Sequence, residues 1–344
     1  MSDKTDRGYF FEDYRLGQIF DHATPRTVTA GDAALYQALY PNRFALSSAD
    51  TFARACGLPR APLEDLAAFH IVFGKTVPDL SLNAVANLGY AEGRFLRPVY
   101  PGDTLSARSE VIGLRQTGSG KTGIVWVRTT GLDQGGETVL SYCRWVMVRK
   151  RDPNAPAPTP VVPELATHVA PGDLVLPAGL DFTAYDTTAA GSRWRWGDYD
   201  IGEVIDHVDG VTLEEAEHML ATRLWQNTAR VHFDTRARAD GRRLIYGGHI
   251  ISLARALSFN GLGNAQRIAA INAGRHVAPA FAGDTVTAWS QVLDKARTQR
   301  ADIGTLRLRL AATTEPDRAG ALRDGDTDAP GLLLDFDYWA LIPT

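Results

Sequence analysis

The chain has 344 residues, of which 44% are hydrophobic and 22% charged, and its formal net charge is -4. This length suits two domains or one large barrel, and the balanced charge lacks the basic excess that nucleic-acid binding requires. The only cysteines, Cys56 and Cys143, are far apart, so neither a disulfide framework nor a structural zinc site is expected. We therefore predict a globular, cytoplasmic protein with no nucleic-acid partner.

The N-terminus carries no apolar segment that would direct export. Its first seven residues, Met1 to Arg7, are polar and mostly charged. No later stretch approaches the roughly 18–20 consecutive apolar residues of a membrane span. We expect a protein that is neither exported nor embedded in a membrane.

The sequence contains a long internal repeat. Residues 10–49 align without a gap with residues 195–234 at an offset of 185, and residues 93–104 align with 274–285 at an offset of 181. Such self-similarity predicts one domain duplicated within the chain. The identical pairs of the first block are Asp13/Asp198, Tyr14/Tyr199, Gly17/Gly202, Asp21/Asp206, His22/His207, Thr27/Thr212, Leu35/Leu220, Leu39/Leu224 and Asn42/Asn227.

A proline-rich segment, Arg151 to Pro160, separates the two copies. Proline cannot donate to a sheet ladder, so this segment is predicted to be an extended connector. We expect an N-terminal domain over residues 1–150, a linker over 151–170 and a C-terminal domain over 171–344.

Each copy is predicted to begin with a Tyr-x-x-Gly turn and a helix. In the second copy Thr212 and Glu215 have the spacing of a capping box. A strongly apolar helix, Ile250 to Leu257, follows the glycine pair Gly247-Gly248 and is expected to be buried. Alternating segments predict strands, and residues 315–330 are typical of a surface hairpin loop. These elements favour an α+β fold in which an antiparallel sheet wraps around a central helix in each half. The predicted strands are residues 122–128, 140–148, 304–310 and 332–342.

A polar cluster stands just before the glycine pair. Residues 224–234 include Gln, Asn, Arg, His and Asp side chains. The cluster supplies proton-transfer groups, and the start of the following helix supplies backbone N–H donors. This combination is typical of an active site.

Two segments of the repeat resemble a known family. Pro98 to Leu105 and Pro279 to Val286, together with a cluster that ends in His232 ahead of a glycine-started helix, resemble the hot-dog fold of MaoC-like dehydratases and R-specific enoyl-CoA hydratases. The resemblance implies a tandem (double) hot-dog fold and a CoA-thioester substrate. Residues 246–253 and the full length are most similar to the members that hydrate mesaconyl-CoA, also called 2-methylfumaryl-CoA, to β-methylmalyl-CoA. No metal and no cofactor beyond the CoA of the substrate are expected.

The family's hydratase signature runs Asp-x-Asn-Pro-aliphatic-His. Here His232 takes the histidine position, but Asn227 stands where the family has the aspartate. An asparagine cannot accept a proton as an aspartate can, so the resemblance implies that His232 is the main acid/base and that Asn227 orients the water. Ser47 replaces His232 in the first copy, which favours a catalytic second half. Asn42 matches Asn227, so a shared turn role is an alternative for that residue.

The remaining site residues are also assigned from the resemblance. The Gly247 N–H is predicted to stabilise the thioester oxygen. Arg230 replaces the family's proline and could bind a substrate carboxylate, with a surface salt bridge as the alternative. Tyr246, Gly248 and Asp234 are predicted to bind substrate, although Asp234 could instead face solvent.

The CoA phosphates require basic residues, and a solvated charged loop explains the nearby arginines equally well. His249 is matched by His70, so a structural role is expected for both.

Three alternatives remain for the function: another R-specific enoyl-CoA hydratase, a hot-dog acyl-CoA thioesterase, or a non-catalytic acyl-CoA-binding module. The two halves can pair within one chain, and a homodimer is compatible with this pairing. The candidate phosphate-binding residues are Arg236, Arg238, Arg242 and Arg243.

Overall fold

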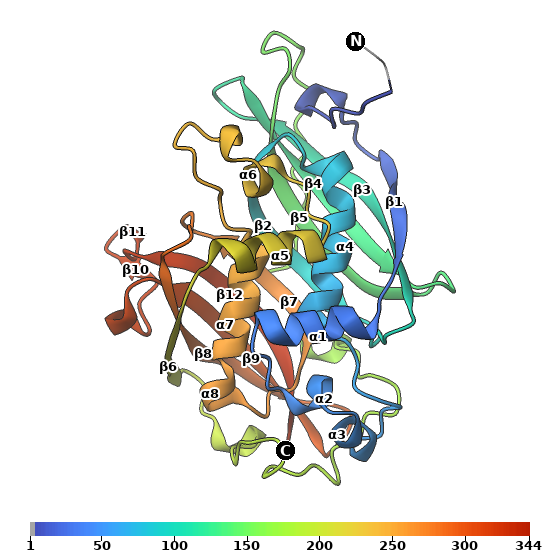
Figure 1. Cartoon of the computed structure of the whole chain (residues 1–344), viewed down its shortest axis with the longest axis vertical. Coiled ribbons are helices and arrows are strands. Elements are labelled where there is room, and N and C mark those ends of the chain that lie inside the picture. The colour runs from blue at the N-terminus through green and yellow to red at the C-terminus, as the bar shows by residue number, and fades with distance from the viewer. Residues whose placement is uncertain (1–3) are drawn as a thin grey trace.

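The computed structural model describes residues 4–344, so the first residues of the polar N-terminus, Met1 to Asp3, lie outside it. Its main element is one ten-stranded antiparallel sheet with the strand order β1-β3-β4-β5-β2-β7-β12-β9-β8-β6 (Figure 1). From its outer edge to the junction, the first half has the strand order β1-β3-β4-β5-β2, and the second half has the order β6-β8-β9-β12-β7. In both halves the second strand of the half lies at the junction. The two halves therefore share one topology and meet at β2 and β7.

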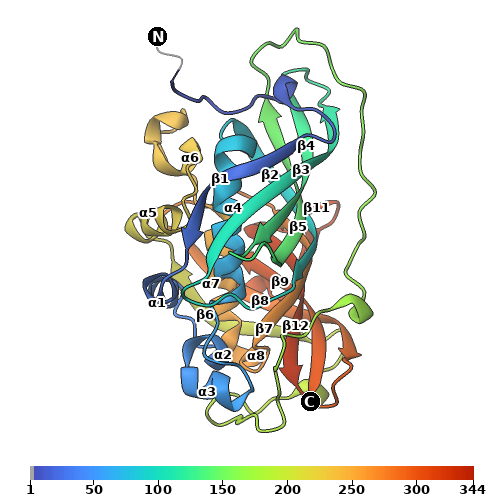
Figure 2. The same ribbon diagram turned by 90° about the vertical axis from the view of Figure 1, so that its right-hand side faces the viewer.

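The first half wraps its strands around one long helix, α4. This helix contacts β3 and β1, which curve around it (Figure 2). Among the described residues, three shorter α-helices and one 3-10 helix, η1, precede it. The elements are η1 Phe11–Asp13, β1 Ile19–Thr27, α1 Ala30–Leu39, α2 Ala45–Ser48, α3 Asp50–Ala55, α4 Asp65–Leu80, β2 Ala84–Phe95, β3 Thr104–Gln116, β4 Thr122–Leu132 and β5 Thr138–Arg149.

The second half repeats this arrangement around helix α7. This helix contacts β8 and β9 and lies on the same face of the sheet as α4 (Figure 1). The elements are η2 Pro171–Asp173, η3 Trp196–Asp198, β6 Val204–Thr212, α5 Glu215–Leu224, α6 Arg230–Phe233, η4 Thr235–Ala237, α7 Gly247–Leu257, α8 Phe259–Leu262, β7 Arg267–His276, β8 Thr285–Arg297, β9 Ile303–Thr313, η5 Pro316–Arg318, β10 Arg323–Asp324, β11 Thr327–Asp328 and β12 Leu332–Pro343.

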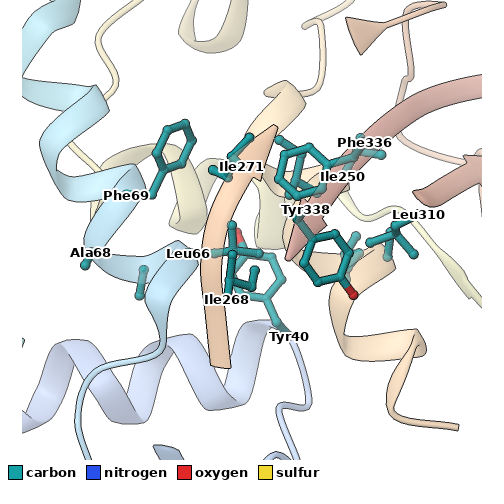
Figure 3. Close-up of a cluster of buried hydrophobic side chains, with 14 of the residues drawn as sticks. Tyr40, Leu66, Ala68, Phe69, Ile250, Ile268, Ile271, Leu310, Phe336 and Tyr338 are labelled. Atoms are coloured by element: carbon teal, nitrogen blue, oxygen red, sulfur yellow. The ribbon is translucent and has the colours of Figure 1, made fainter. Parts of the chain in front are cut away.

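One hydrophobic core continues across the junction of the halves. Figure 3 shows side chains of α4, such as Phe69, beside side chains of β7, such as Ile271, and of β12, such as Phe336. These side chains are at most 1% exposed. The halves therefore share apolar burial, which is the main stabilising contribution to folding.

Matching contacts in the two halves confirm the duplication. His22 Nε2 lies 2.8 Å from Ser109 Oγ, and His207 Nε2 lies 2.8 Å from Ser290 Oγ. The tyrosines of the predicted Tyr-x-x-Gly turns also match: Tyr14 donates its hydroxyl to the Leu80 carbonyl at the end of α4, and Tyr199 donates to the Gly261 carbonyl in α8, directly after α7. Each His–Ser pair thus joins the first strand of a half to the neighbouring strand, and each tyrosine joins the preceding turn to the helical layer.

Most of the predicted elements are confirmed, including the four strands and the buried helix that begins at Gly247. The capping box at Thr212 is wrong. Thr212 ends β6, where its Oγ1 hydrogen-bonds to Thr285 Oγ1 at 2.9 Å, and α5 begins later, at Glu215. The box occurs in the first half instead, where Thr29 caps α1 and pairs with Asp32.

The segment between β5 and β6 runs along the outside of the molecule (Figure 2). Its one isolated bridge joins Val161 to Leu114, and the rest of residues 150–203 contains no strand. The predicted surface hairpin of residues 315–330 contains the short pair β10 and β11. Across the described chain, residues 4–344, no helix has the length and apolar character that a membrane crossing requires.

A close contact joins α4 of the first half to the end of α5 in the second. A Cβ placed on Gly74 would lie 1.7 Å from the Trp225 carbonyl oxygen and 2.9 Å from its carbonyl carbon. Only glycine allows the two backbones to approach this closely. The turn that contains Gln226 and Asn227 therefore rests directly on α4.

We expect Gly74→Ala to lower the free energy of unfolding by about 1–3 kcal/mol, because the new methyl group must push the Trp225 backbone away. Alanine is about 1 kcal/mol more favourable than glycine in a helix interior. A net loss of stability would therefore show that the clash costs more than this gain. Denaturant unfolding of both proteins tests this. Gly118→Ala is the control, since a Cβ at Gly118 meets nothing within 4 Å. Equal stability of the Gly74→Ala protein and the wild type would contradict the proposed contact.

Candidate active site

A cavity of about 360 Å³ lies at the junction of the two halves. It is bounded by the end of α4, the start of β2, the turn before α6, the start of α7 and the end of β7. Aliphatic and aromatic side chains dominate its walls. Its lining residues with polar side chains are Ser81, Asn87, Tyr90, Arg144, Asn227, His232, Arg238, Tyr246 and His276.

His232 lies on the single-turn helix α6, and hydrogen bonds to the Leu244 backbone fix its position. Its Nδ1 donates to the Leu244 carbonyl oxygen at 2.7 Å, and the Leu244 N–H donates to the Val231 carbonyl oxygen at 2.9 Å. A carbonyl oxygen can only accept, so Nδ1 carries the proton and Nε2 is the free base. Burial lowers the pKa of His232 to about 4, against a smaller opposing effect of the Leu244 hydrogen bond. The ring is therefore a neutral proton acceptor near pH 7.

Asn227 ends the turn that rests on α4. The turn has a positive φ of 55° at Gln226, and the buried Asn227 side chain accepts the Ala229 N–H at 3.2 Å. Asn42 accepts the Phe44 N–H in the same way at 3.3 Å. The shared hydrogen bond fits the predicted turn role. In the second half the same asparagine also lines the cavity, and its amide Nδ2 is chemically a hydrogen-bond donor.

Gly247 is the first residue of α7, so its N–H has no carbonyl partner one turn earlier in the helix. A Cβ at this position would lie 2.3–2.6 Å from three atoms of the His276 ring. Glycine therefore lets the imidazole cover the helix start. Just before it, the Tyr246 N–H donates to His218 Nε2 at 2.9 Å, which fixes where the helix begins.

Several buried histidines surround this helix start. Burial lowers the pKa of His218 to about 3 and that of His276 to about 4. His276 Nε2 lies 3.1 Å from the Tyr90 hydroxyl, and the His218 and His232 ring centroids are 6.0 Å apart. His70 and His249 are fully buried between the two central helices, where His70 Nε2 lies 2.8 Å from Ser252 Oγ. The cluster is therefore uncharged at neutral pH.

The structure brings only some of the sequence-predicted residues together. His232, Asn227, Gly247 and Tyr246 line the cavity, but Gly248 packs behind them against Tyr246 and His70. Arg230 is exposed and is not among the lining residues. Asp234 also lies outside the lining. Its side chain caps the Arg236 N–H and pairs with the Arg236 guanidinium, and the hydrogen bonds to Arg236 lower its pKa to about 2.

The predicted phosphate-binding arginines form a loop beside the cavity. Arg238 lines the cavity and pairs with Asp240 at 2.6 Å. Arg242 lies over the Phe281 ring, with its guanidinium carbon 4.0 Å from the ring centroid. Arg243 pairs with Glu215. These pairs fit a solvated charged loop, and their position at the cavity also fits a site for an anionic group.

Sequence reasoning missed five polar residues of the cavity, namely Ser81, Asn87, Tyr90, Arg144 and His276. His276 had a detectable signal, because it aligns with Phe95 in the repeat just as His232 aligns with Ser47. Arg144 is a charged residue on the otherwise apolar face of β5. Tyr90 on β2 had no such signal, because a buried aromatic strand residue is ordinary core.

No aspartate or glutamate lines the cavity within residues 4–344. The position of the family's aspartate is filled by Asn227, and none of the described lining residues supplies a carboxylate in its place. The imidazoles of His232 and His276 are thus the proton acceptors that the cavity presents. The site can move a proton at a neutral base beside an N–H donor at a helix start.

Comparison with known proteins places this chain in a family. The family model for mesaconyl-CoA hydratase matches residues 1–320. A mesaconyl-CoA hydratase from Cereibacter sphaeroides is 68% identical over 99% of both chains. A β-methylmalyl-CoA dehydratase from Chloroflexus aurantiacus is 60% identical over 100% of this chain and 99% of its own.

Solved structures agree with the fold. A MaoC domain protein dehydratase from Chloroflexus aurantiacus superposes with a TM-score of 0.97 at 60% identity, over 99% of both chains. A Mycobacterium tuberculosis protein described as having a double hot-dog fold superposes with a TM-score of 0.76 at 27% identity, over 98% of this chain and 99% of its own. The chain has the α+β double hot-dog fold that the resemblance implied, and it belongs to the mesaconyl-CoA hydratase family.

Proposed function

We propose that the chain reversibly adds water across the double bond of mesaconyl-CoA to give β-methylmalyl-CoA. The two relatives similar over the full length carry these activities in their names. The observation that carries the proposal is the neutral His232, held at Nδ1 by Leu244 and placed in one cavity with Asn227 and the start of α7. Hydration changes no overall oxidation state, so the proposal includes no cofactor.

His232 accepts a proton from water in the proposed mechanism. The hydroxide oxygen forms a bond to the β-carbon while the electrons of the double bond move toward the α-carbon and the thioester oxygen. Asn227 Nδ2 donates a hydrogen bond that orients the water. A proton then bonds to the α-carbon, so one water is added and His232 is neutral again.

The lowered pKa of His232 suits the second proton transfer. Burial disfavours the imidazolium, so a protonated ring gives its proton up readily to a carbon of enolate character. The same burial makes the neutral ring a weak base toward water. Stabilisation of the enolate must compensate for that weakness.

The Gly247 N–H is the proposed source of this stabilisation. It lies at the start of α7, where the helix dipole favours negative charge and no helical carbonyl occupies the N–H. Such a donor typically contributes about 3–4 kcal/mol in the transition state. The apolar walls of the cavity strengthen the interaction because they exclude water.

The proposal extends to substrate contacts and cell location. Arg238, which lines the cavity beside Arg242, is the best placed of the four loop arginines for a CoA phosphate. The ring of Tyr246 is proposed to contact the acyl group.

Cys56 and Cys143 are free and buried, which supports a cytoplasmic location. The two halves already pair within the chain, so the proposal requires no partner subunit, and it is compatible with a further homodimer.

Two alternative reactions differ in their products. A thioesterase would release free CoA, and carboxylates typically serve such an enzyme as nucleophile or base. The lining of the cavity within residues 4–344 presents none. An R-specific hydratase of other enoyl-CoA esters would instead accept crotonyl-CoA as well as mesaconyl-CoA. Incubation with both esters, followed by enoyl absorbance and free thiol, distinguishes the three reactions.

We expect His232→Gln to lower kcat by about 10²- to 10⁴-fold with little change in the binding of substrate, because the variant removes the proton acceptor. Steady-state hydration of mesaconyl-CoA measures this. His168→Gln, in the connector outside the cavity, is the matched control and should retain wild-type rates. Wild-type turnover by His232→Gln would remove the case for His232 as the base.

The pH profile tests the protonation state of the same histidine. The active form is neutral and its pKa in the folded protein lies below the usual value, so kcat/KM should be constant from about pH 6 to 8 and fall below pH 5. A loss of activity centred near pH 6.5 would show an ordinary, solvated histidine instead.

Stability must be followed in parallel. The buried histidines exclude protons that the unfolded chain binds, so stability is complete above about pH 6.5 and declines as the pH falls toward 4. Melting temperatures at each pH separate this unfolding from the titration of the site. A melting temperature that is constant from pH 7 to 4.5 would contradict the lowered pKa values.

A further inference from the structure

Arg144 is a buried cation that the proposed mechanism does not use. It lies on β5 with 0% of its surface exposed and lines the cavity. Its Nη2 donates to Thr76 Oγ1 at 2.8 Å and to Ser81 Oγ at 3.4 Å. Its Nε and Nη1 have no hydrogen-bond partner. Three of the five guanidinium N–H donors are therefore unsatisfied inside the protein.

The surroundings of Arg144 supply no negative charge. Among residues 4–344 it forms no salt bridge, and the ionisable groups that act most strongly on its charge are the tyrosines Tyr142, Tyr90, Tyr246 and Tyr14. The face of Phe73 lies 4.2 Å from the guanidinium carbon and offers partial compensation. Burial of a cation without an anionic partner is costly, so the site is incomplete without an anion.

The pseudo-symmetric position in the other half provides an internal comparison. Arg144 pairs with Tyr90 across the sheet, and Tyr338 pairs with Ile271 at the corresponding point, so Tyr338 replaces Arg144 there. That half carries its buried arginine, Arg255, on the helix instead, at the position of Thr76.

Arg255 differs from Arg144 in having acidic neighbours within the chain. Burial raises the pKa of Glu64 to about 7, while Arg255 lowers it, and Arg255 also acts on Asp65. Its Nη2 donates to the Ala265 carbonyl oxygen. Arg255 thus lies near two carboxyl groups of the protein, although its Nε has no hydrogen-bond partner in the described chain. By contrast, no carboxyl group is among the described groups that act most strongly on Arg144.

Neutral polar groups accompany Arg144 in the cavity. Asn87 has both Nδ2 and Oδ1 buried without a partner, and Ser81 and Tyr90 also line the cavity. A guanidinium beside an amide and a hydroxyl forms a site that suits a planar anion such as a carboxylate. His276 connects this site to the helix start, because its ring covers Gly247 and its Nε2 lies 3.1 Å from the Tyr90 hydroxyl.

We infer that Arg144, with Asn87 and Ser81, binds the free carboxylate of the substrate and so selects enoyl-CoA esters that carry a carboxylate on the β-carbon. The inference rests on the proposed hydration, because that reaction brings the β-carbon to His232. It assigns to Arg144 the role that the sequence predicted for the exposed Arg230. The first half of the chain then determines which acyl group is accepted, and the second half carries out proton transfer.

The test measures binding without chemistry. Two saturated esters that cannot be hydrated, 2-methylsuccinyl-CoA and 2-methylbutanoyl-CoA, differ only in the carboxylate and are titrated into the full-length protein by calorimetry. We expect the wild type to bind the carboxylated ester at least about tenfold more tightly, and Arg144→Gln to abolish this preference. Equal affinities in the wild type would overturn the inference, as would a preference that survives in Arg144→Gln.

A second variant guards against misfolding of Arg144→Gln. Ser81→Asp places a carboxylate beside the guanidinium, so it should raise the melting temperature and also remove the preference for 2-methylsuccinyl-CoA. Retention of the preference in Ser81→Asp would contradict the inference. Arg230→Gln forms the rival arm, because loss of the preference there, with Arg144→Gln unchanged, would assign the carboxylate to Arg230.

Kinetics separate this inference from the proposed function. Arg144→Gln should lower kcat/KM for mesaconyl-CoA by about 10²-fold or more, but by less than about fivefold for 2-methylbut-2-enoyl-CoA, which lacks the carboxylate. A wild type that hydrates neither ester would refute the proposed function while the binding preference still tests Arg144. Equal losses for both esters would show a structural role and overturn the inference.

Discussion

The antiparallel pairing of β2 with β7 is the constraint on which the site depends. It joins two five-stranded halves into one sheet and sets α4 beside α7, so that the cavity forms where the halves meet. Tyr90 on β2 and His276 on β7 meet across this junction, and Gly93 approaches Ile271 too closely for any side chain. A shift of register by one residue would turn alternate side chains away from the cavity. Each half thus lacks part of the site without the other.

The duplication explains why the site is asymmetric. Contacts that hold the fold are kept in both halves, as the His22–Ser109 and His207–Ser290 pairs show. Groups that face the cavity differ between equivalent positions, since His232 replaces Ser47 and Arg144 replaces Tyr338. Two halves encoded in one chain can diverge in this way, whereas two identical subunits cannot. The division of roles between the halves follows from that freedom.

Much of this architecture could be predicted from the sequence because the repeat is long and the strands alternate clearly. The buried helix was predictable from Gly247-Gly248 and the apolar run behind it, and His232 from the loss of its counterpart at Ser47. The cap of α5 was not, because Thr212 belongs equally to a strand end until its pairing with Thr285 is known. Arg144 could not be placed either, because its importance depends on the absence of a nearby carboxylate, which only the folded chain reveals. Local sequence patterns predict elements, whereas the charge balance of a cavity depends on residues far apart in the chain.

The surroundings of Arg255 in the second half bear on how many ligands one polypeptide can bind. Arg255 lies against the Phe44 ring and over the ring of Tyr338, which is the counterpart of Arg144 by pseudo-symmetry. Tyr338 is fully buried and is not among the described residues that line the cavity, so the second half presents no counterpart of the Arg144 site. A double hot-dog chain of this kind should bind one ligand per polypeptide, although its fold contains two equivalent scaffolds. One half of the duplicated scaffold then serves as a wall of the cavity in which the other half carries out proton transfer.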